Sequence, residues 1–504
     1  MPETTPPRLT VAMVVRNDAD ALSQSLRSIA AIADEMIVVD TGSTDNSREV
    51  AAQFGCQVIE FLWSDDFSAA RNAALPQITS DWILWLYAGE TLDEADATDL
   101  RRSIMAGQLN SSTAYVMIIK PPAAQGVIAA EQVARLRLIP NTSGIRFQGR
   151  VRESLYETLE NLGIDIDGLP FRILRGTREN DAALKRRRAQ RNLHLADLEI
   201  SEQGRTPTLI NCQAEAAQTL GNTERAVALY TETLELDTQP SNERLEAYYG
   251  LLTCLDAMPD ARATQLSLCV KALEEFPLDA QLLCAMGGYL QADNRVDLAA
   301  RSYQTACEFG HVNPLVWHLD EITAIAAVCH SAVLQAQGDD DAALDVLQNA
   351  IVREGNSPRI RRALLELHIK SGRQDAALQQ VKYVADETTA DQLALAVEGA
   401  CLASGQQWDV GQAKLEQAYA TGCRDAVCFR WLTLSFLACE QLDAAGQVLT
   451  AWRDCHPADP DPIRIGQAVF GATPEAAAGG SNRRIDLPGN LTGSQAGQAA
   501  SVRK

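Results

Sequence analysis

Polar and charged residues gather directly after apolar runs in the first hundred residues of this chain. The clusters are Arg16-Asn17-Asp18, Asp40-Thr41-Gly42-Ser43, the stretch from Asp65 to Asn72, and Tyr87-Ala88-Gly89-Glu90. An acid at the end of a strand accepts hydrogen bonds from a ribose or a base, and an arginine faces a base or a phosphate as a planar fork. No GxGxxG follows the first run and no GxxxxGK[ST] occurs, so a dinucleotide site and a P-loop are not expected.

The elements that position these clusters alternate between strands and helices. Strands are predicted at Leu9 to Val15, Met36 to Val39, Val58 to Phe61 and Asp81 to Tyr87. Helices are predicted after Asp18, after Thr44 or Asp45, and over Phe67 to Ile78. This β-α-β order with short connections predicts a mostly parallel wound sheet, which binds its ligands at the carboxyl ends of the strands. Further strands are expected at 114–119 and 134–139.

The chain changes character near residue 180, where strand patterns give way to amphipathic helices. A basic helix, Lys185 to Glu199, comes first. A small residue then recurs every 34 positions, at Ala343, Ala377, Gly411 and Ala445. This period resembles the tetratricopeptide repeat (TPR), in which paired helices approach closely at a small residue. Ala226 and Ala299 fill similar positions, and the 44-residue step from Ala299 to Ala343 predicts an insertion.

Composition narrows the classes of function. The 504 residues carry a formal charge of −22, which argues against a protein that binds a nucleic-acid backbone. The first residues lack the pattern of a secretory signal and no apolar run reaches the length of a bilayer span, so a cytoplasmic protein is expected. The 12 cysteines show no CxxC pair and are predicted to be buried free thiols, and the six histidines have no metal-like spacing.

Four strings in the first half resemble the family 2 glycosyltransferases of the GT-A fold, in the branch fused to TPR repeats. They are VVRNDADALSQSLRSI, ADEMIVVDTGSTDNS, FLWSDDFSAARNAAL and SDWILWLYAGETL, followed later by ARLRLIP, GIRFQGRVRESL and KRRRAQRNLHLADLE. The resemblance implies a nucleotide-sugar donor, expected to be uridine-linked. By position it assigns the donor-binding shell to Arg16, Asn17, Asp40, Asp66, Arg71 and Asn72.

The chain departs from that family's sequence pattern at the residues that bind the metal. The family pattern Asp-Ala-Asp-Glu reads Tyr87-Ala88-Gly89-Glu90 here, so both aspartates that hold a divalent ion are missing. The family pattern Gly-Arg-Val-His-Glu reads Gly149 to Glu153, with Arg152 in place of histidine. A departing nucleoside diphosphate needs a cation. Arg150 or Arg152 would supply it, Glu153 would be the general base, and no divalent metal is expected to bind.

Each of these assignments has a structural alternative. Asp40 could cap the helix that follows it, Asp65 and Asp66 could be solvated acids at a helix N-terminus, and Arg71 could be a surface residue. Glu153 could be the ion-pair partner of Arg150 or Arg152. Trp82 and Trp85 are expected in the core rather than as sugar platforms, and the basic run from Lys185 is expected to be a solvated face or a contact to the acidic repeats.

The predicted organisation is an N-terminal tail (1–8), a family 2-like α/β domain (9–178), a connecting helix (179–204), TPR-like repeats (205–460) and a disordered tail (471–504). Two functions remain open. One is an inverting glycosyltransferase that acts on a protein or glycan acceptor presented by the repeats. The other is a degenerate pseudoenzyme whose repeats bind a protein or peptide partner.

Overall fold

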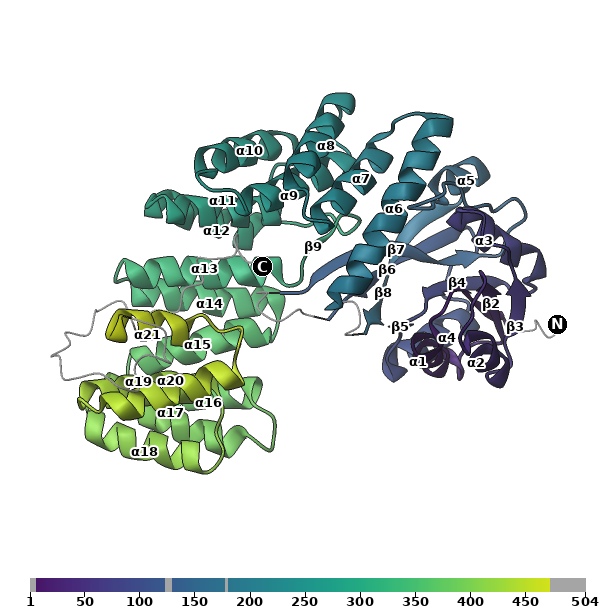
Figure 1. Ribbon diagram of the computed structural model, residues 1–504. Coiled ribbons are helices and arrows are strands. Elements are labelled where there is room, and N and C mark those ends of the chain that lie inside the picture. The colour runs from purple at the N-terminus through teal and green to yellow at the C-terminus, as the bar shows by residue number, and fades with distance from the viewer. Residues whose placement is uncertain (1–5, 123–128, 177–179, 472–504) are drawn as a thin grey trace. The chain divides into compact units, whose positions relative to one another are not determined.

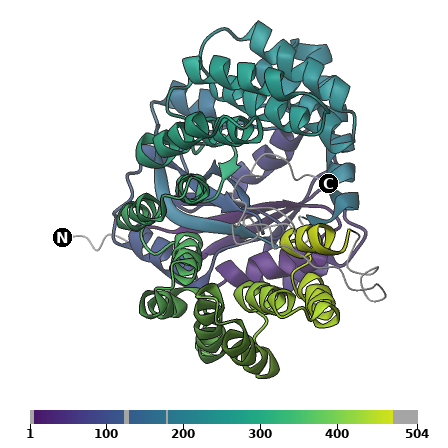
Figure 2. The ribbon, with the colours of Figure 1, turned by 90° about the vertical axis from the view of Figure 1, so that its left-hand side faces the viewer.

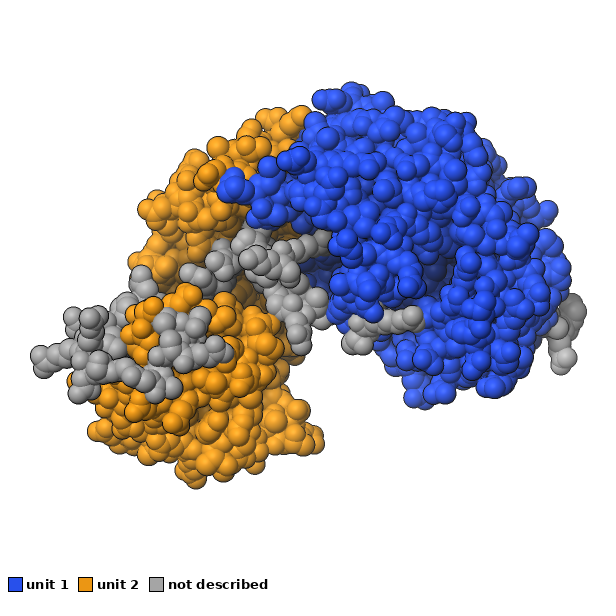
Figure 3. Space-filling view, viewed as in Figure 1, with its two compact units in different colours: residues 1–124, 129–259, 313–320 blue, residues 125–128, 260–312, 321–504 orange. Residues whose placement is uncertain are grey.

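The computed structural model describes residues 6–122, 129–176 and 180–471. The chain forms two compact units, coloured separately in Figure 3. Unit 1 comprises residues 1–124, 129–259 and 313–320, and unit 2 comprises 125–128, 260–312 and 321–504. The predicted tails lie outside the described residues, apart from residues 6–8 and Gly471.

Unit 1 is built on a nine-stranded mixed sheet in the order β3-β2-β1-β4-β7-β6-β8-β5, with β9 paired to β7 (Figure 1). The strands are β1 (Leu9–Val15), β2 (Glu35–Asp40), β3 (Gln57–Glu60), β4 (Trp82–Tyr87), β5 (Glu90–Thr91), β6 (Thr113–Lys120), β7 (Glu131–Pro140), β8 (Asp165–Arg175) and β9 (His318–Leu319). The first four are mutually parallel. β7 runs antiparallel to β4 and β6, so the parallel half ends at β4.

Helices cover both faces of the sheet because side chains alternate along each strand. Leu9, Val11 and Met13 of β1 pack on the face that holds α1 (Ala19–Ile29), α2 (Ser47–Gln53) and α4 (Glu94–Met105). The opposite face carries Ala12 of β1 and Trp85 of β4 against α3 (Phe67–Ala74) and α5 (Tyr156–Leu162). Trp82 is buried as well, so both tryptophans lie in the core as predicted.

The predicted first four strands and first two helices are confirmed, with small shifts at their ends. The third helix is shorter than predicted, because Pro76 follows α3 in a 3₁₀ turn, Leu75–Gln77. β8 was not predicted. Its sequence contains Gly168 and Pro170, which weaken a strand pattern, yet it lies parallel to β6 through a register shift.

Helices after the sheet also belong to unit 1: α6 (Ala182–Gln203), α7 (Pro207–Thr219), α8 (Thr223–Leu236) and α9 (Asn242–Asp256). Asp181 caps α6 through Ala183 and Leu184, and Thr206 caps α7 with Pro207 at its first position. Leu195 and Ala196 of α6 share a buried cluster with Val151 and with Leu209 of α7. The first helices of the repeat region therefore pack in the same unit as the sheet.

Unit 2 consists of antiparallel helix pairs, visible in two views (Figures 1 and 2). Its helices are α10 (Arg262–Glu275), α11 (Ala280–Ala292), α12 (Val296–Phe309), α13 (Ile322–Ala336), α14 (Asp340–Glu354), α15 (Pro358–Lys370), α16 (Gln374–Val384), α17 (Ala390–Ser404), α18 (Trp408–Ala420), α19 (Ala426–Ala438), α20 (Leu442–Cys455) and α21 (Asp461–Phe470).

The 34-residue period marks the second helix of each pair. Ala343, Ala377 and Ala445 are fully buried on α14, α16 and α20. Gly411 is buried on α18, where an added Cβ would lie 2.8 Å from the backbone nitrogen of Ala403. Close helix approach at the small residue is therefore confirmed.

The predicted insertion lies between α12 and α13, and it contains β9. Its residues 313–320 belong to unit 1. The backbone N–H of Ala134 on β7 donates to the Pro314 carbonyl, and Arg135 donates to the Leu315 carbonyl at 2.8 Å. Lys120 of β6 forms an ion pair with Asp320.

Candidate functional site

Asp40 ends β2 with its carboxylate buried, at 1% exposure. Its Oδ1 accepts hydrogen bonds from the backbone N–H groups of Gly42 and Ser43, both at 3.0 Å, and from Arg48 Nε at 3.0 Å. Burial opposes the charge, but the bonds from Ser43, Gly42 and Arg48 outweigh it and hold the pKa of Asp40 below its usual range. Its Oδ2 has no hydrogen-bond partner among the described residues.

Residues 40–45, which we call the Asp40 loop, are tied to the end of β1. Asn17 has a left-handed φ of 52°, and its side-chain oxygen accepts from the Thr44 N–H at 2.6 Å. The Asn17 N–H donates to Ser43 Oγ at 3.0 Å. Asp45 accepts from Ser47 and from the Ala19 N–H, so it joins the start of α2 to the start of α1. Asn17 and Asp40 therefore lie at neighbouring strand ends as predicted; Arg16 and Asn17 are exposed there and Asp40 is buried.

Arg71 and Glu153 form a buried ion pair, with Arg71 Nε 2.7 Å from Glu153 Oε1. The Tyr87 hydroxyl donates to the same oxygen at 3.0 Å. The Arg71 guanidinium lies 4.7 Å from the Trp85 ring centre and 4.9 Å from that of Tyr87. Burial opposes the charge of Arg71, but Tyr87 and Glu153 together raise its pKa above its ordinary value.

Glu90 is also buried and accepts from two arginines. Arg137 Nη2 lies 2.8 Å from Glu90 Oε1, and Arg175 Nη2 lies 3.0 Å from the same oxygen. Glu90 Oε2 accepts from the Tyr87 N–H at 2.9 Å. Burial opposes ionisation, but Arg137 and Arg175 lower the pKa of Glu90. The Arg137 guanidinium lies 4.7 Å from the Tyr87 ring centre.

These six residues, Arg71, Tyr87, Glu90, Arg137, Glu153 and Arg175, form what we call the arginine cluster. It holds three guanidiniums and two carboxylates around one phenol. Divalent ions prefer hard oxygen ligands, but Glu90 is paired with two arginines, and the Tyr87 hydroxyl donates a hydrogen bond to Glu153. An acid at position 89 would need the left-handed φ of 91° that Gly89 adopts. The residues at this corner do not fit a divalent ion, and no metal-like group of His, Cys, Asp or Glu occurs in the described parts of the chain.

Arg150 and Arg152 point into ion pairs with the helices that follow the sheet. Arg150 Nη2 lies 2.6 Å from Glu202 of α6. Arg152 contacts Glu246 of α9 and Glu215 of α7, in each case at 2.8 Å. The expected substitute cations are therefore neutralised within the chain. The arginine that pairs with Glu153 is Arg71, not Arg150 or Arg152.

Two residues assigned to the donor shell hold local structure. Asp66 is the N-cap of α3 and accepts from the Ala69 N–H at 2.9 Å, so it is an acid at a helix N-terminus, the structural alternative for this residue. Asn72 exchanges two hydrogen bonds with the backbone of Phe147, at 2.9 and 2.8 Å. These contacts fix the start of α3 and the segment before Glu153.

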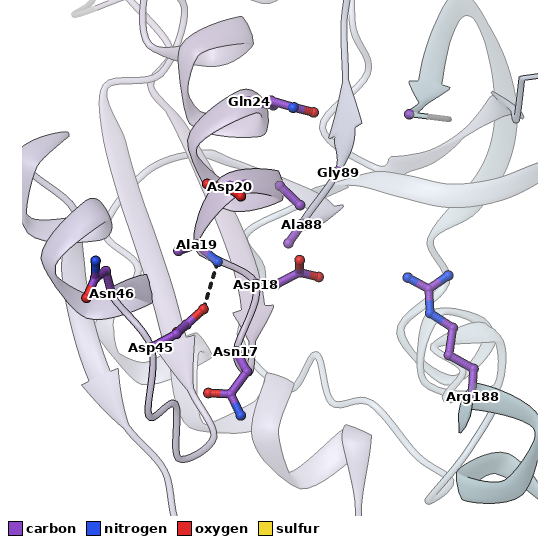
Figure 4. A pocket seen from close by; sticks show the side chains of 12 residues that line it. Asn17, Asp18, Ala19, Asp20, Gln24, Asp45, Asn46, Ala88, Gly89 and Arg188 are labelled. Atoms are coloured by element: carbon purple, nitrogen blue, oxygen red, sulfur yellow. Dashed lines mark hydrogen bonds between the residues drawn. The ribbon is translucent and has the colours of Figure 1, made fainter. Parts of the chain in front are cut away.

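A cavity of about 630 Å³ opens beside the ends of β1 and β4. Asn17, Asp18, Ala88 and Gly89 line one side, and Arg188 of α6 extends toward them from the other (Figure 4). The cavity lies where strand order reverses, since β1 leads to β2 on one side and pairs with β4 on the other.

Sequence reasoning missed three arginines at this site. Arg137 carried a signal, because it is a charge inside the apolar run ARLRLIP and such a residue needs a partner when the strand is buried. Arg175 lay on the unpredicted β8. Arg188 was expected on a solvated face, yet it is half-buried and lines the cavity.

Residues 10–100 match the sequence profile of the family described as "Glycosyl transferase family 2". The N-terminal domain is a family 2 glycosyltransferase domain. A TPR repeat-containing protein of Synechococcus elongatus is 35% identical over 153 residues, covering 30% of this chain and 36% of that one. The family 2 domain is thus fused to a helical region of the TPR kind.

Other relatives match shorter stretches. An uncharacterized glycosyltransferase of Rickettsia felis is 31% identical over 87 residues, covering 17% of this chain and 30% of that protein. The chain thus spans about a third of the length of these two curated relatives.

Two solved structures are similar to parts of this chain. A tetratricopeptide repeat protein from Parabacteroides merdae has 13% identity and a TM-score of 0.36, over 49% of this chain and 93% of its own. Glucosyl-3-phosphoglycerate synthase from Mycobacterium tuberculosis, solved with Mn²⁺, UDP-glucose and phosphoglyceric acid, has 18% identity and a TM-score of 0.19, over 23% of this chain and 44% of its own. No helix in the described residues has the length and apolar character to cross a membrane.

Proposed function

We propose that the family 2 domain binds a nucleotide-sugar donor at the carboxyl ends of β1 and β2, and transfers the sugar to a protein or glycan acceptor without a divalent ion. The observation that carries the proposal is Asp40 Oδ2, a buried carboxylate oxygen for which the described part of the chain offers no hydrogen-bond partner. A buried polar atom without a partner is costly. The N–H of a base or the hydroxyl of a ribose would satisfy it, and a uridine nucleotide is the expected ligand.

The positive charge for the donor diphosphate would come from the arginine cluster. It brings three guanidiniums together at the place where the family pattern has its metal-binding aspartates. Buried charges act at a lower effective dielectric than charges in water, so guanidiniums fixed here would interact strongly with a neighbouring diphosphate. This proposal replaces the earlier expectation for Arg150 and Arg152, whose guanidiniums contact carboxylates of the helices after the sheet.

Glu153 is the candidate general base. In inverting transfer it would take the proton of the acceptor hydroxyl, whose oxygen bonds to the anomeric carbon. The nucleoside diphosphate then leaves with the electron pair of the broken bond. The structure also favours a second candidate function, donor binding without transfer, because Glu153 Oε1 is already engaged by Arg71 and Tyr87. A base in such an ion pair must leave its partners before it can accept a proton.

The helix pairs of unit 2 are the proposed surface for a protein or peptide partner, since stacked helix pairs of this kind form extended binding surfaces. The partner would be the acceptor in the first candidate function and a recruited protein in the second.

Calorimetry with UDP, GDP and dTDP sugars, in EDTA and in Mn²⁺, tests donor binding. Release of the nucleoside diphosphate then tests turnover. We expect millimolar or tighter binding in EDTA, and weaker binding in Asp40→Asn because an amide N–H would face the donor group of the base. Absence of binding for every nucleotide would refute the proposal. Binding with no release, with or without an acceptor, would establish the second candidate.

A further inference from the structure

The segment that carries Glu153 is held by carboxylates from the helices after the sheet. Residues 149–153, which we call the Glu153 loop, contain the two cations Arg150 and Arg152. Four carboxylates from α6, α7 and α9 contact this loop: Glu199, Glu202, Glu215 and Glu246. All of these residues belong to unit 1.

Two of the carboxylates fix the beginning of the loop. Glu199 Oε2 accepts from the Arg150 N–H at 2.7 Å and from the Val151 N–H at 3.4 Å. Glu202 accepts two hydrogen bonds from the Arg150 guanidinium, at 3.0 and 2.6 Å. The Arg150 carbonyl in turn accepts from the Phe67 N–H at the start of α3. This end of the loop is therefore anchored through its backbone.

The other two carboxylates act one residue before Glu153. Arg152 makes a two-pronged contact to Glu246, at 2.9 and 2.8 Å, and its Nη2 also contacts Glu215 at 2.8 Å. Asn211 of α7 donates to Glu246 at 3.2 Å and orients that carboxylate. Burial opposes ionisation of Glu246, but Arg152 outweighs it and lowers the pKa of Glu246.

The backbone at Arg152 makes this anchor consequential. Arg152 has a left-handed φ of 52°, a conformation that costs about 1 kcal/mol or more for a residue other than glycine unless its surroundings hold it. The next residue is Glu153, whose carboxylate must lie within hydrogen-bonding distance of Arg71 and Tyr87. Releasing Arg152 would free the backbone torsion that aims Glu153.

We propose that Glu246 is a positioning residue for Glu153, so that the first repeat helices complete the catalytic site through Arg152 rather than serving only as a binding surface. This inference rests on the proposed function for the role of Glu153. A bidentate guanidinium–carboxylate contact fixes both the distance between the two groups and their relative orientation. The further contacts from Asn211 to Glu246 and from Arg152 to Glu215 support this geometry. Asn211 and Glu246 lie 35 residues apart, and their hydrogen bond joins the first helices of consecutive repeats beside Arg152.

The test uses the full chain with Glu246→Gln, which keeps the shape of the side chain and removes its charge. The matched control is Glu232→Gln, which breaks the exposed Arg205–Glu232 pair on α8 of the same unit. We expect Glu246→Gln to lower kcat for donor hydrolysis or transfer at least tenfold while the calorimetric Kd for the donor nucleotide stays within twofold. Glu232→Gln should change neither. Arg152→Gln should give the same loss, and the double variant no further loss, because both changes break one connection.

A second readout is independent of turnover. Amide hydrogen exchange across residues 148–154 should accelerate at least tenfold in Glu246→Gln and remain unchanged in Glu232→Gln. Wild-type exchange rates in Glu246→Gln would overturn the inference whether or not the chain is an enzyme. So would an unchanged kcat in a chain that turns over, or additive losses in the double variant. Failure of the wild type to bind any donor would instead refute the proposed function and leave the exchange result to decide the anchoring role.

Discussion

The Asp40 loop and the arginine cluster lie on the same sheet, but they are built in different ways. Asp40 receives its hydrogen bonds from residues two, three and eight positions along the chain. In the arginine cluster, Arg71 and Glu153 are 82 residues apart, and Glu90 lies 47 and 85 residues from its two arginines. A short string of sequence thus fixes the Asp40 carboxylate, whereas the arginine cluster requires the completed domain.

The two regions also differ in what they leave for a ligand. The Asp40 carboxylate has one buried oxygen that no residue described in the structure pairs with. The carboxylates of the arginine cluster are both paired with arginines. The proposed nucleotide contact at Asp40 therefore does not depend on positions 87 and 89, where the family pattern has its metal-binding aspartates. Four predictions test this contrast.

The largest effect is expected for Glu90→Gln. This change leaves Arg137 and Arg175 without their buried counter-charge, which typically costs about 3–5 kcal/mol in the free energy of unfolding. Urea unfolding measures it. Glu60→Gln is the control, because Glu60 is 72% exposed in its pair with Arg48 and should cost no more than about 1 kcal/mol. Equal costs for the two variants would mean that the cluster is not a buried unit.

Asp40→Asn should weaken nucleotide binding by about 10- to 100-fold, or about 1.4–2.8 kcal/mol, because it removes a charged acceptor. Calorimetry with the best-binding nucleotide measures the change. Asp93→Asn, which alters only the cap of α4, should leave the affinity as it is. If both variants bind like the wild type, the unpaired oxygen of Asp40 does not contact the ligand.

Acid should destabilise unit 1 through Glu90 and Glu246, whose pKa values lie below the ordinary 4.5 in the folded chain. The unfolded chain binds these protons more tightly, so the stabilisation is present above about pH 4.5 and is lost as the pH falls through the lowered folded values. Each unit of lowering contributes about 1.4 kcal/mol. The free energy of unfolding, measured from pH 7 to pH 3, should fall less steeply with pH in Glu90→Gln than in the wild type. A parallel pH dependence in the two proteins would show that Glu90 does not ionise differently on unfolding.

The smallest effect is expected for added Mn²⁺. Since Glu90 is occupied by two arginines, millimolar Mn²⁺ should change the donor Kd by less than tenfold, or about 1.4 kcal/mol. Paired titrations in EDTA and in Mn²⁺ test this, and Mg²⁺ serves as a second ion. A larger gain in donor affinity would mean that Mn²⁺ displaces the arginines from Glu90. The arginine cluster would then also offer a carboxylate to a ligand, as the Asp40 loop does.

The same contrast explains what the sequence could predict. β1 to β4 and the 34-residue helix period follow from local apolar patterns, as Ala377 and Gly411 illustrate. The surroundings of the Asp40 carboxylate were predictable because its hydrogen bonds come from residues close to it in the sequence. Asp66 and Asn72 look the same in sequence whether they bind a ligand or hold α3. The partners of Arg152 lie 63 and 94 residues later, on helices whose position relative to the sheet no local pattern encodes.

Residues 313–320 have a consequence for how this gene can change. The chain leaves the sheet-bearing unit after Pro259, returns to it for β9, and leaves it again after residue 320. A single break at residue 259 would therefore remove a strand from β7 along with the repeats. Duplication or deletion of whole repeats after α13 would leave every strand of the sheet in the chain. The number of repeats between α9 and β9 is constrained, because β9 must still pair with β7. Length variation among descendants of this gene should accordingly concentrate in the last third of the chain.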